Sequence, residues 1–155
     1  MSAVFDQNYV RRLDGPNAKS KASKRDLAEA IRKDIRDFKA AHSCDRMVVI
    51  WCASTEIFLE PGPAHQNLGT LEAAMDANDE SVPPSMLYAY AALKEGVPFI
   101  NGAPNLAVDV PAMVELARSA GVPVAGKDFK SGQTLLKTVL APMLKARMLG
   151  LAGWY

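Results

Sequence analysis

The 155-residue sequence is poor in several residue types that mark whole classes of protein. It has two cysteines, Cys44 and Cys52, and their spacing fits neither a zinc site nor a redox pair, so we expect free thiols in a reducing cytoplasm. It also has two histidines, His42 and His65, and neither has a second metal ligand near it in the sequence. We therefore predict no metal site, and we expect both histidines at the surface or in loops.

The sequence also lacks a strong net charge and long apolar runs. Its formal net charge of +1 argues against a general electrostatic role with nucleic acids or membranes. No apolar run is long enough to span a bilayer, and the N-terminus does not read as a signal peptide. These absences predict a cytoplasmic protein with neither a nucleic-acid nor a membrane partner.

Several motifs of known chemistry are absent as well. There is no dinucleotide-binding G-x-G-x-x-G, no G-x-S-x-G nucleophile elbow and no H-E-x-x-H zinc motif. Residues 121–128 approach a phosphate-binding G-x-x-x-x-G-K-[ST] loop, but Asp128 stands where the magnesium-binding hydroxyl belongs and would repel phosphate. The apolar residues between these glycines favour a strand instead.

What the sequence does contain is a regular alternation of helix and strand patterns. Ser23 and Asp26 fit the acidic variant of a capping box at the start of an amphipathic helix. Strands are predicted at 47–52, 97–100 and 122–125, and the first is a continuous apolar run typical of a strand covered on both faces. Helices are predicted at 68–77, 81–95, 109–120 and after residue 130. This order predicts one α/β domain with a parallel sheet.

The final predicted helix carries an apolar stripe that we expect to be buried. The stripe consists of Leu135, Leu136, Val139, Leu140, Met143 and Leu144. Asp128 or Ser131 can cap this helix, and Pro142 is expected to kink or split it. Residues 147–155 resemble the start of a further strand and end on two aromatics, as in a chain that has been cut.

A small polar turn follows each predicted strand, at 53–56, 101–105 and 126–131. Because parallel strands end at one edge of a sheet, we expect the three turns to lie together there. Ligands of open α/β sheets bind at that edge, although ordinary turns also use such residues. The first 25 residues are rich in Lys and Arg, which fits either a solvated surface loop or a patch for a phosphorylated partner.

The three turns together resemble signatures of the myo-inositol-1-phosphate synthase family. Residues 50–58 (IWCASTEIF) are similar to its LWTANTERY, residues 101–107 (NGAPNLA) to its NGSPQNT, and residues 127–134 (KDFKSGQT) to its DDFKSGQT. The sequence departs from the family at Ile57 in place of Arg, Ala103 in place of Ser, and Lys127 in place of the first Asp.

The resemblance implies a Rossmann-like, mostly parallel sheet with flanking helices. Residues 1–22 would be a loop or an incomplete N-terminal segment, 23–126 part of an NAD-binding domain, and 127–155 the start of the catalytic and tetramerisation region. The family's glycine-rich NAD turn and its downstream active-site signature are not in this sequence. We therefore expect a truncated chain that corresponds to the middle third of the enzyme.

The implied reaction is the NAD-dependent isomerisation of D-glucose 6-phosphate to 1D-myo-inositol 3-phosphate in inositol and phospholipid biosynthesis. It proceeds by oxidation, enolisation, aldol cyclisation and reduction. The resemblance assigns catalysis to Lys130 and, second, Lys137, which would place positive charge beside oxygens that become anionic. It assigns the NAD site to Cys52, Ala53, Ser54, Thr55, Asn101, Gly102, Ala103 and Asp128.

For partners, the resemblance implies glucose 6-phosphate and a homo-oligomer, a tetramer in the family, or a complementing chain. Two alternatives stay open: a non-catalytic remnant, and one half of a split enzyme. By itself the chain is expected to be inactive and to self-associate.

Overall fold

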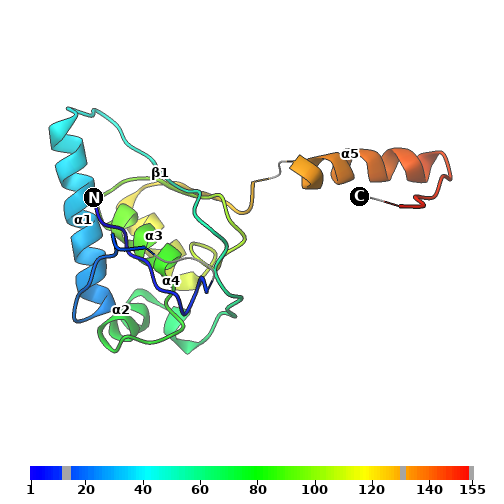
Figure 1. Ribbon diagram of the computed structural model, residues 1–155. Helices are drawn as coiled ribbons and strands as arrows, with labels where there is room; N and C mark the ends of the chain where they lie inside the picture. The colour runs from blue at the N-terminus through cyan, green and yellow to red at the C-terminus, as the bar shows by residue number, and fades with distance from the viewer. Residues whose placement is uncertain (12–14, 130–131, 154–155) are drawn as a thin grey trace.

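The computed structural model describes residues 1–11, 15–129 and 132–153. Helices and strands alternate along the chain in the predicted order (Figure 1). The elements are α1 Lys24–Ala41, β1 Val49–Trp51, the short 3₁₀ helix η1 Pro63–His65, α2 Leu68–Asp76, α3 Pro84–Lys94, β2 Phe99–Asn101, α4 Pro111–Ala120, β3 Val124–Gly126 and α5 Gly132–Ala146.

The three strands form one parallel sheet in the order β1-β2-β3. Val49 pairs with Phe99 and Phe99 with Val124, so the strands begin level with one another. This parallel sheet with flanking helices confirms the predicted α/β class. Each strand is three residues long, shorter than the apolar runs suggested.

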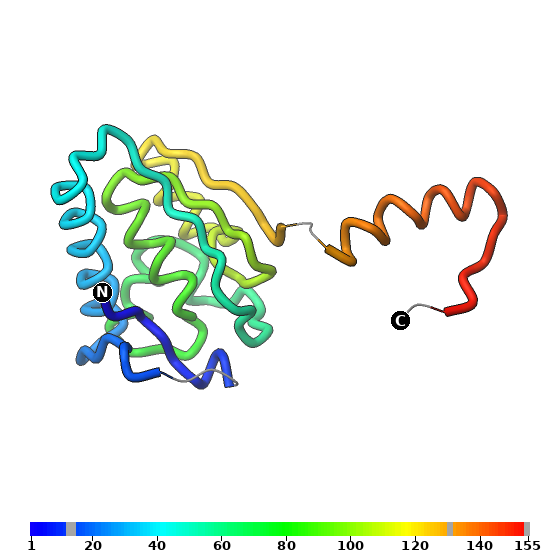
Figure 2. The backbone as a smooth tube through the Cα atoms, turned by 45° about the horizontal axis from the view of Figure 1, so that its top comes forward, coloured from blue at the N-terminus to red at the C-terminus, as the bar shows by residue number. Residues whose placement is uncertain are grey.

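The core is built around α3, which packs against α1, α4, β1 and β2. Nine of its eleven residues are buried, including Met86, Leu87 and Tyr90. A helix surrounded in this way needs apolar residues on every side, which explains why its sequence shows no polar face. Figure 2 shows helices α1 to α4 gathered beside the sheet, with α1 along the outside of the body.

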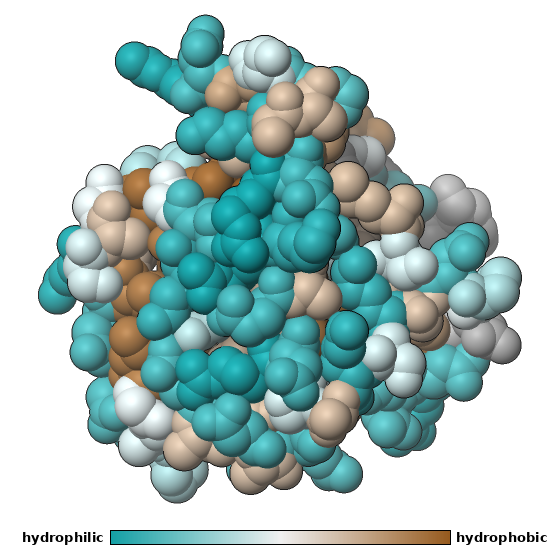
Figure 3. Space-filling model, turned by 90° about the vertical axis from the view of Figure 1, so that its left-hand side faces the viewer, coloured by the Kyte–Doolittle hydropathy of each residue, from teal (hydrophilic) through white to brown (hydrophobic). Residues whose placement is uncertain are grey.

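Helix α1 confirms its sequence prediction in detail. The Ser23 side chain accepts a hydrogen bond from the Asp26 N–H, and the Asp26 carboxylate accepts one from the Ser23 N–H, so the capping box is complete. Ala28 and Ile31 are buried against the core. The outer surface over α1 is mainly hydrophilic (Figure 3), as an amphipathic helix on a core requires.

The prediction that β1 is covered on both faces is wrong. Val49 and Trp51 pack against the core, whereas Val48 and Ile50 are about half exposed. The helix α3 lies against the face that carries Val49 and Phe99. Because side chains alternate along a strand, residues 48 and 50 point to the opposite face.

The prediction that α5 buries an apolar stripe is also wrong. The helix projects away from the body in both views (Figures 1 and 2), and none of its described residues is buried. Its apolar side chains, such as Leu136 and Val139, are more than half exposed because no described segment packs along them. The helix runs unbroken through Pro142, since losing one backbone donor does not end it here. Residues 147–148 form a turn and residues 149–153 have no regular secondary structure, so the predicted strand does not form in this described segment.

His65 is fully buried within η1, so the prediction that it lies at the surface or in a loop is wrong. Its Nδ1 accepts a hydrogen bond from the Gly62 N–H at 2.9 Å, and its Nε2 lies 3.0 Å from the Ser81 carbonyl oxygen. The ring therefore ties η1 to the segment before α3. Among the described residues, no helix has the length and apolar character needed to cross a membrane.

Candidate functional site

The register of the sheet places the three polar turns at a single edge. Trp51 pairs with Asn101 and Asn101 with Gly126, so all three strands end at the same level. The turns that follow therefore leave the sheet side by side, as the sequence predicted from strand order. In the first turn, Cys52, Ala53, Ser54 and Thr55 are all exposed.

Gly102 is the point where the three turns meet. Its N–H donates to the Trp51 carbonyl at 2.9 Å, and its own carbonyl accepts from the Phe129 N–H at 3.1 Å. A Cβ added to Gly102 would lie 2.6 Å from the Trp51 oxygen and 2.7 Å from a carbon of the Phe129 ring. Only glycine fits such a close approach. No role for Phe129 was predicted from the sequence, where its only signal is its place between two motif residues.

The turn after β2 is held from inside by Asn101, which has no exposed surface. Its Nδ2 donates to the Asn105 carbonyl at 2.8 Å, and its Oδ1 accepts from the Ala103 N–H at 3.1 Å. Ala103 is buried as well. The side chain of Asn101 therefore shapes the turn, and Gly102 is the part of this turn's predicted site that keeps some exposure.

Glu56 is a buried carboxylate at the end of the first turn, directly after four exposed residues. It accepts hydrogen bonds from the N–H and the hydroxyl of Ser85, and its backbone N–H donates to Asn105 Oδ1 at 2.9 Å. Burial raises the pKa of Glu56, and the Ser85 hydrogen bonds offset this only in part. Because α3 has Pro83 at its N-cap, Glu56 supplies the acceptor that the helix start lacks. Sequence reasoning matched Glu56 to a motif but gave it no role.

A salt bridge joins the turn after β3 to the loop after β2. Lys127 Nζ lies 2.6 Å from Asp109 Oδ2, beside a hollow of about 240 Å³ at the end of β3. Burial raises the pKa of Asp109, but the Lys127 ammonium and nearby N–H groups outweigh it, so the pKa lies below its usual value. Lys127 is one of the departures from the family motif, and it acts here as a tether between two site loops.

The structure describes one of the two predicted catalytic lysines, Lys137. Lys130 and the candidate cap Ser131 lie outside the described residues. Lys137 is exposed on α5, and α5 stands apart from the sheet (Figure 1). Asp128 is half-buried at the edge with a left-handed backbone, φ 61°. Since α5 begins at Gly132, Asp128 is too far upstream to be its N-cap.

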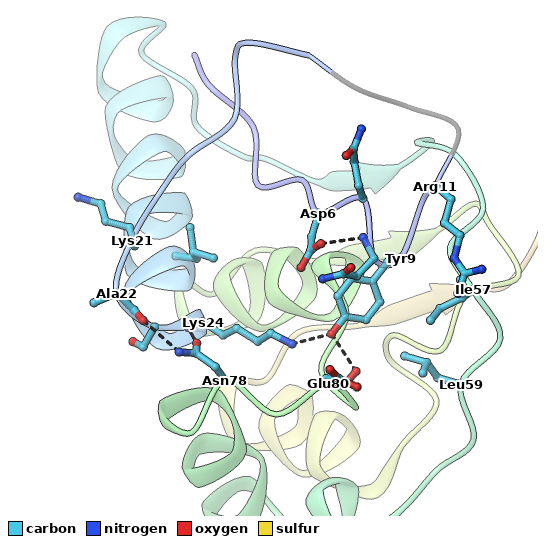
Figure 4. Close-up of a pocket in the computed structure, with 14 residues that line it drawn as sticks. Asp6, Tyr9, Arg11, Lys21, Ala22, Lys24, Ile57, Leu59, Asn78 and Glu80 are labelled. Atoms are coloured by element: carbon cyan, nitrogen blue, oxygen red, sulfur yellow. Dashed lines mark hydrogen bonds between the residues drawn. The ribbon is translucent and has the colours of Figure 1, made fainter.

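A second polar site lies under the N-terminal segment (Figure 4) and reaches the residues just after the first turn, where the Ile57 N–H donates to the Tyr9 carbonyl at 2.8 Å. Lys24 Nζ donates to the Tyr9 hydroxyl at 2.6 Å and to the carbonyls of Asp79 and Val82 at 2.6 and 2.8 Å. Burial lowers the pKa of Lys24 and raises that of Tyr9. The surrounding cavity measures about 820 Å³.

Other basic residues near the N-terminus form ion pairs within the fold. Lys19 pairs with Asp34 at 2.7 Å, and Arg25 pairs with Asp76 at 3.2 Å. With Lys24 also bonded inside the fold, these cations support the chain's own structure. They favour the surface-loop interpretation over a basic patch for a phosphorylated partner. Among the described residues, no cluster of His, Cys, Asp or Glu could hold a metal ion.

A parallel α/β sheet with small polar turns at its C-terminal edge defines the class of Rossmann-like nucleotide-binding domains. Residues 1–151 match a family model of the NAD-binding type, described as myo-inositol-1-phosphate synthase. The chain belongs to the myo-inositol-1-phosphate synthase family, and NAD is the cofactor indicated by that family model.

Individual relatives agree with this assignment. The chain is 56% identical over its whole length to inositol-3-phosphate synthase 1 of Bacteroides thetaiotaomicron, of which it covers 36%. It is 43% identical over 93% of its length to inositol-3-phosphate synthase of Dictyostelium discoideum, covering 29% of that protein. The inositol-3-phosphate synthase structure from Caenorhabditis elegans superposes with a TM-score of 0.84 at 30% identity, covering 96% of this chain and 30% of that one. The chain thus spans about a third of the length of these relatives.

Proposed function

We propose that this chain supplies one wall of the NAD site and the start of the catalytic region of an inositol-3-phosphate synthase. That enzyme would isomerise D-glucose 6-phosphate to 1D-myo-inositol 3-phosphate. The observation that carries the proposal is the shared register of Trp51, Asn101 and Gly126, which gathers the three family motifs at one sheet edge. The 56% identity to the Bacteroides thetaiotaomicron protein supports the same reaction.

The first two turns fit a dinucleotide. NAD, when bound, supplies a reversible hydride acceptor. Residues 52–55 are small and exposed, so their backbone can approach a bound ligand closely. Gly102 continues this surface, while Asn101 and Ala103 hold the turn in shape from inside. Asp128, half-buried at the same edge, would orient Lys130 or contact the cofactor.

Lys130 is proposed as the principal catalytic residue and Lys137 as the second. An ammonium beside the reacting oxygens would stabilise the negative charge that forms during enolisation and aldol closure. Lys130 follows Phe129, whose N–H is fixed to the carbonyl of Gly102 at the sheet edge. Lys137 requires a different placement of α5, whose exposed apolar side chains offer a surface for such packing.

The proposal also covers the wider context. Residues 23–126 would belong to the NAD-binding domain and residues 127–155 to the start of the catalytic region. The complete protein would act in the cytoplasm, in inositol and phospholipid biosynthesis. Exposed Leu136 and Val139 on α5 support assembly, either as a homo-oligomer or with a complementing chain.

A chimera tests this function. The segment of the Bacteroides thetaiotaomicron relative that aligns with this chain is replaced by it, and turnover of glucose 6-phosphate and NAD binding are measured. An active chimera supports the proposal. A chimera that folds and binds NAD without turnover indicates the non-catalytic remnant, and one that folds without binding NAD contradicts the cofactor assignment.

Within an active chimera, Lys130→Ala tests the catalytic residue. We expect it to abolish turnover and to leave NAD binding largely intact. Lys145→Ala, which removes an exposed lysine near the end of α5, is the matched control and should change neither property. Near-normal turnover of Lys130→Ala would show that another group supplies the positive charge.

A further inference from the structure

Five polar or charged residues are buried in the described part of the chain, and four of them form one connected group. The group consists of Glu56, Ser85, Asn101 and Asn105. A buried polar side chain is costly unless its hydrogen bonds are satisfied. A concentration of such groups at one place therefore needs an explanation beyond packing.

The hydrogen bonds of this group form a continuous network between the turn after β1 and the turn after β2. At one end, the Glu56 carboxylate accepts the Ser85 N–H at 2.9 Å and also the Ser85 hydroxyl. In the middle, the Glu56 N–H donates to Asn105 Oδ1 at 2.9 Å. At the other end, Asn101 Nδ2 donates to the Asn105 carbonyl at 2.8 Å, and Asn101 Oδ1 accepts the Ala103 N–H.

This hydrogen-bond network holds the two turns that a bound ligand would contact. Glu56 immediately follows the exposed residues 52–55, so fixing Glu56 fixes where the first turn ends. Asn105 and Asn101 bracket Gly102 and Ala103, so they fix the second turn. Ser85 lies at the start of α3, the most buried helix, and connects both turns to the rigid core.

We infer that Glu56 and Asn105 are positioning residues that lock the turn after β1 to the turn after β2. The inference rests on the proposed function in one respect: the locked spacing is the one across which NAD would bind. Neither side chain needs to touch the ligand, because both are buried behind the turns.

The first experiment measures the coupling between the two turns directly in the 155-residue chain, with no cofactor present. Hydrogen exchange of single backbone amides is measured for Glu56→Ala, Glu56→Gln and Asn105→Ala. The reporter for the Glu56 variants is the Ala103 N–H, in the other turn. The reporter for Asn105→Ala is the Ser85 N–H, at the opposite end of the network.

Glu56→Ala keeps the Glu56 N–H that Asn105 accepts and removes the two bonds from Ser85 that hold residue 56 in place. Because we infer that the network opens as one unit, losing one or two net hydrogen bonds at this end should speed exchange of the Ala103 N–H by about tenfold. Glu56→Gln keeps an oxygen for the Ser85 N–H and a donor for the Ser85 hydroxyl, so it should exchange within about twofold of wild type. Asn105→Ala should speed the Ser85 N–H by a similar factor.

His65→Ala is the matched control, because His65 is buried and hydrogen-bonded but lies outside the network. All exchange rates are compared after correction for the stability found by urea unfolding. If Ala103 exchange in Glu56→Ala rises no more than in His65→Ala, the two turns are not locked by this network and the inference is overturned.

A second measurement separates this inference from the proposed function. Because this chain supplies one wall of the NAD site, NAD is titrated into the chimera described above, with and without the same substitutions. Locked turns predict that Glu56→Ala weakens NAD binding at least about tenfold while Glu56→Gln and His65→Ala preserve it. If the chimera without these substitutions folds and binds no NAD, the cofactor proposal fails, and the exchange rates still decide whether the turns are locked.

Discussion

The substitution Gly102→Ala tests the packing of the site edge most sharply. The added methyl would lie 2.6 Å from the Trp51 carbonyl oxygen and 2.7 Å from the Phe129 ring. The oxygen belongs to a paired strand and cannot move without breaking the sheet, whereas the Phe129 ring is half exposed and can swing away. Overpacking of this kind costs about 1–3 kcal/mol of unfolding free energy, which lowers Tm by roughly 2–12 °C in a chain of this size.

The assay is thermal and urea unfolding followed by circular dichroism. Gly62→Ala is the control, because nothing lies within 4 Å of the methyl it would add and Gly62 has an extended backbone. It should change the unfolding free energy by less than about 0.5 kcal/mol. Adding Phe129→Ala to Gly102→Ala should recover only part of the loss, because the clash with Trp51 remains. A Gly102→Ala protein as stable as wild type would refute this description of the edge.

Three further predictions concern charge and exposed surface. The pKa of Glu56 is raised in the folded chain, so its stabilising contribution is present at pH values below its unfolded pKa and is lost as pH rises through the folded pKa. The stability of Glu56→Gln relative to wild type should therefore increase as pH rises above the ordinary carboxyl pKa of 4.5. Urea unfolding at a series of pH values checks this, and a pH-independent difference would contradict it. The pKa of Asp109 is lowered, so its contribution is present above the usual carboxyl pKa and lost as pH falls. As pH falls, wild type should therefore lose unfolding free energy that Lys127→Ala does not lose. The difference should be less than about 1 kcal/mol, and smaller still in high salt, because the pair is partly exposed. Finally, Leu136→Lys with Val139→Lys should reduce self-association in light scattering, since both side chains are exposed on α5; unchanged association would place the contact elsewhere.

Local sequence signals predicted most of the fold. The Ser23 capping box, the glycine that ends α4 and the alternation of apolar runs are all encoded within a few neighbouring residues. Parallel pairing then follows from the order of helices and strands, and the shared edge of the three turns follows from parallel pairing. The sheet edge was therefore predictable before any coordinates.

Long-range partners were not predictable in the same way. The helical spacing of apolar residues predicts that α5 has an apolar face that includes Leu136. The same spacing does not identify the segment that packs on this face. The continuous run at β1 looked buried on both faces because Val48 and Ile50 are as apolar as Val49. The contacts of Glu56 with Ser85 and Asn105 join residues 29 and 49 positions apart, and nothing local in the sequence encodes them.

The most direct test of the central claim maps NAD onto this segment by hydrogen exchange. Exchange of backbone amides is recorded in the active chimera, which holds the complete NAD site, while NAD is added to saturation. We expect exchange in all three turns, 52–55, 102–103 and 127–128, to slow together with one affinity. Amides around Lys24, in the cavity under the N-terminal segment, should not change. Slower exchange confined to that cavity, or unchanged exchange in the three turns, would contradict the claim that the sheet edge forms the cofactor site.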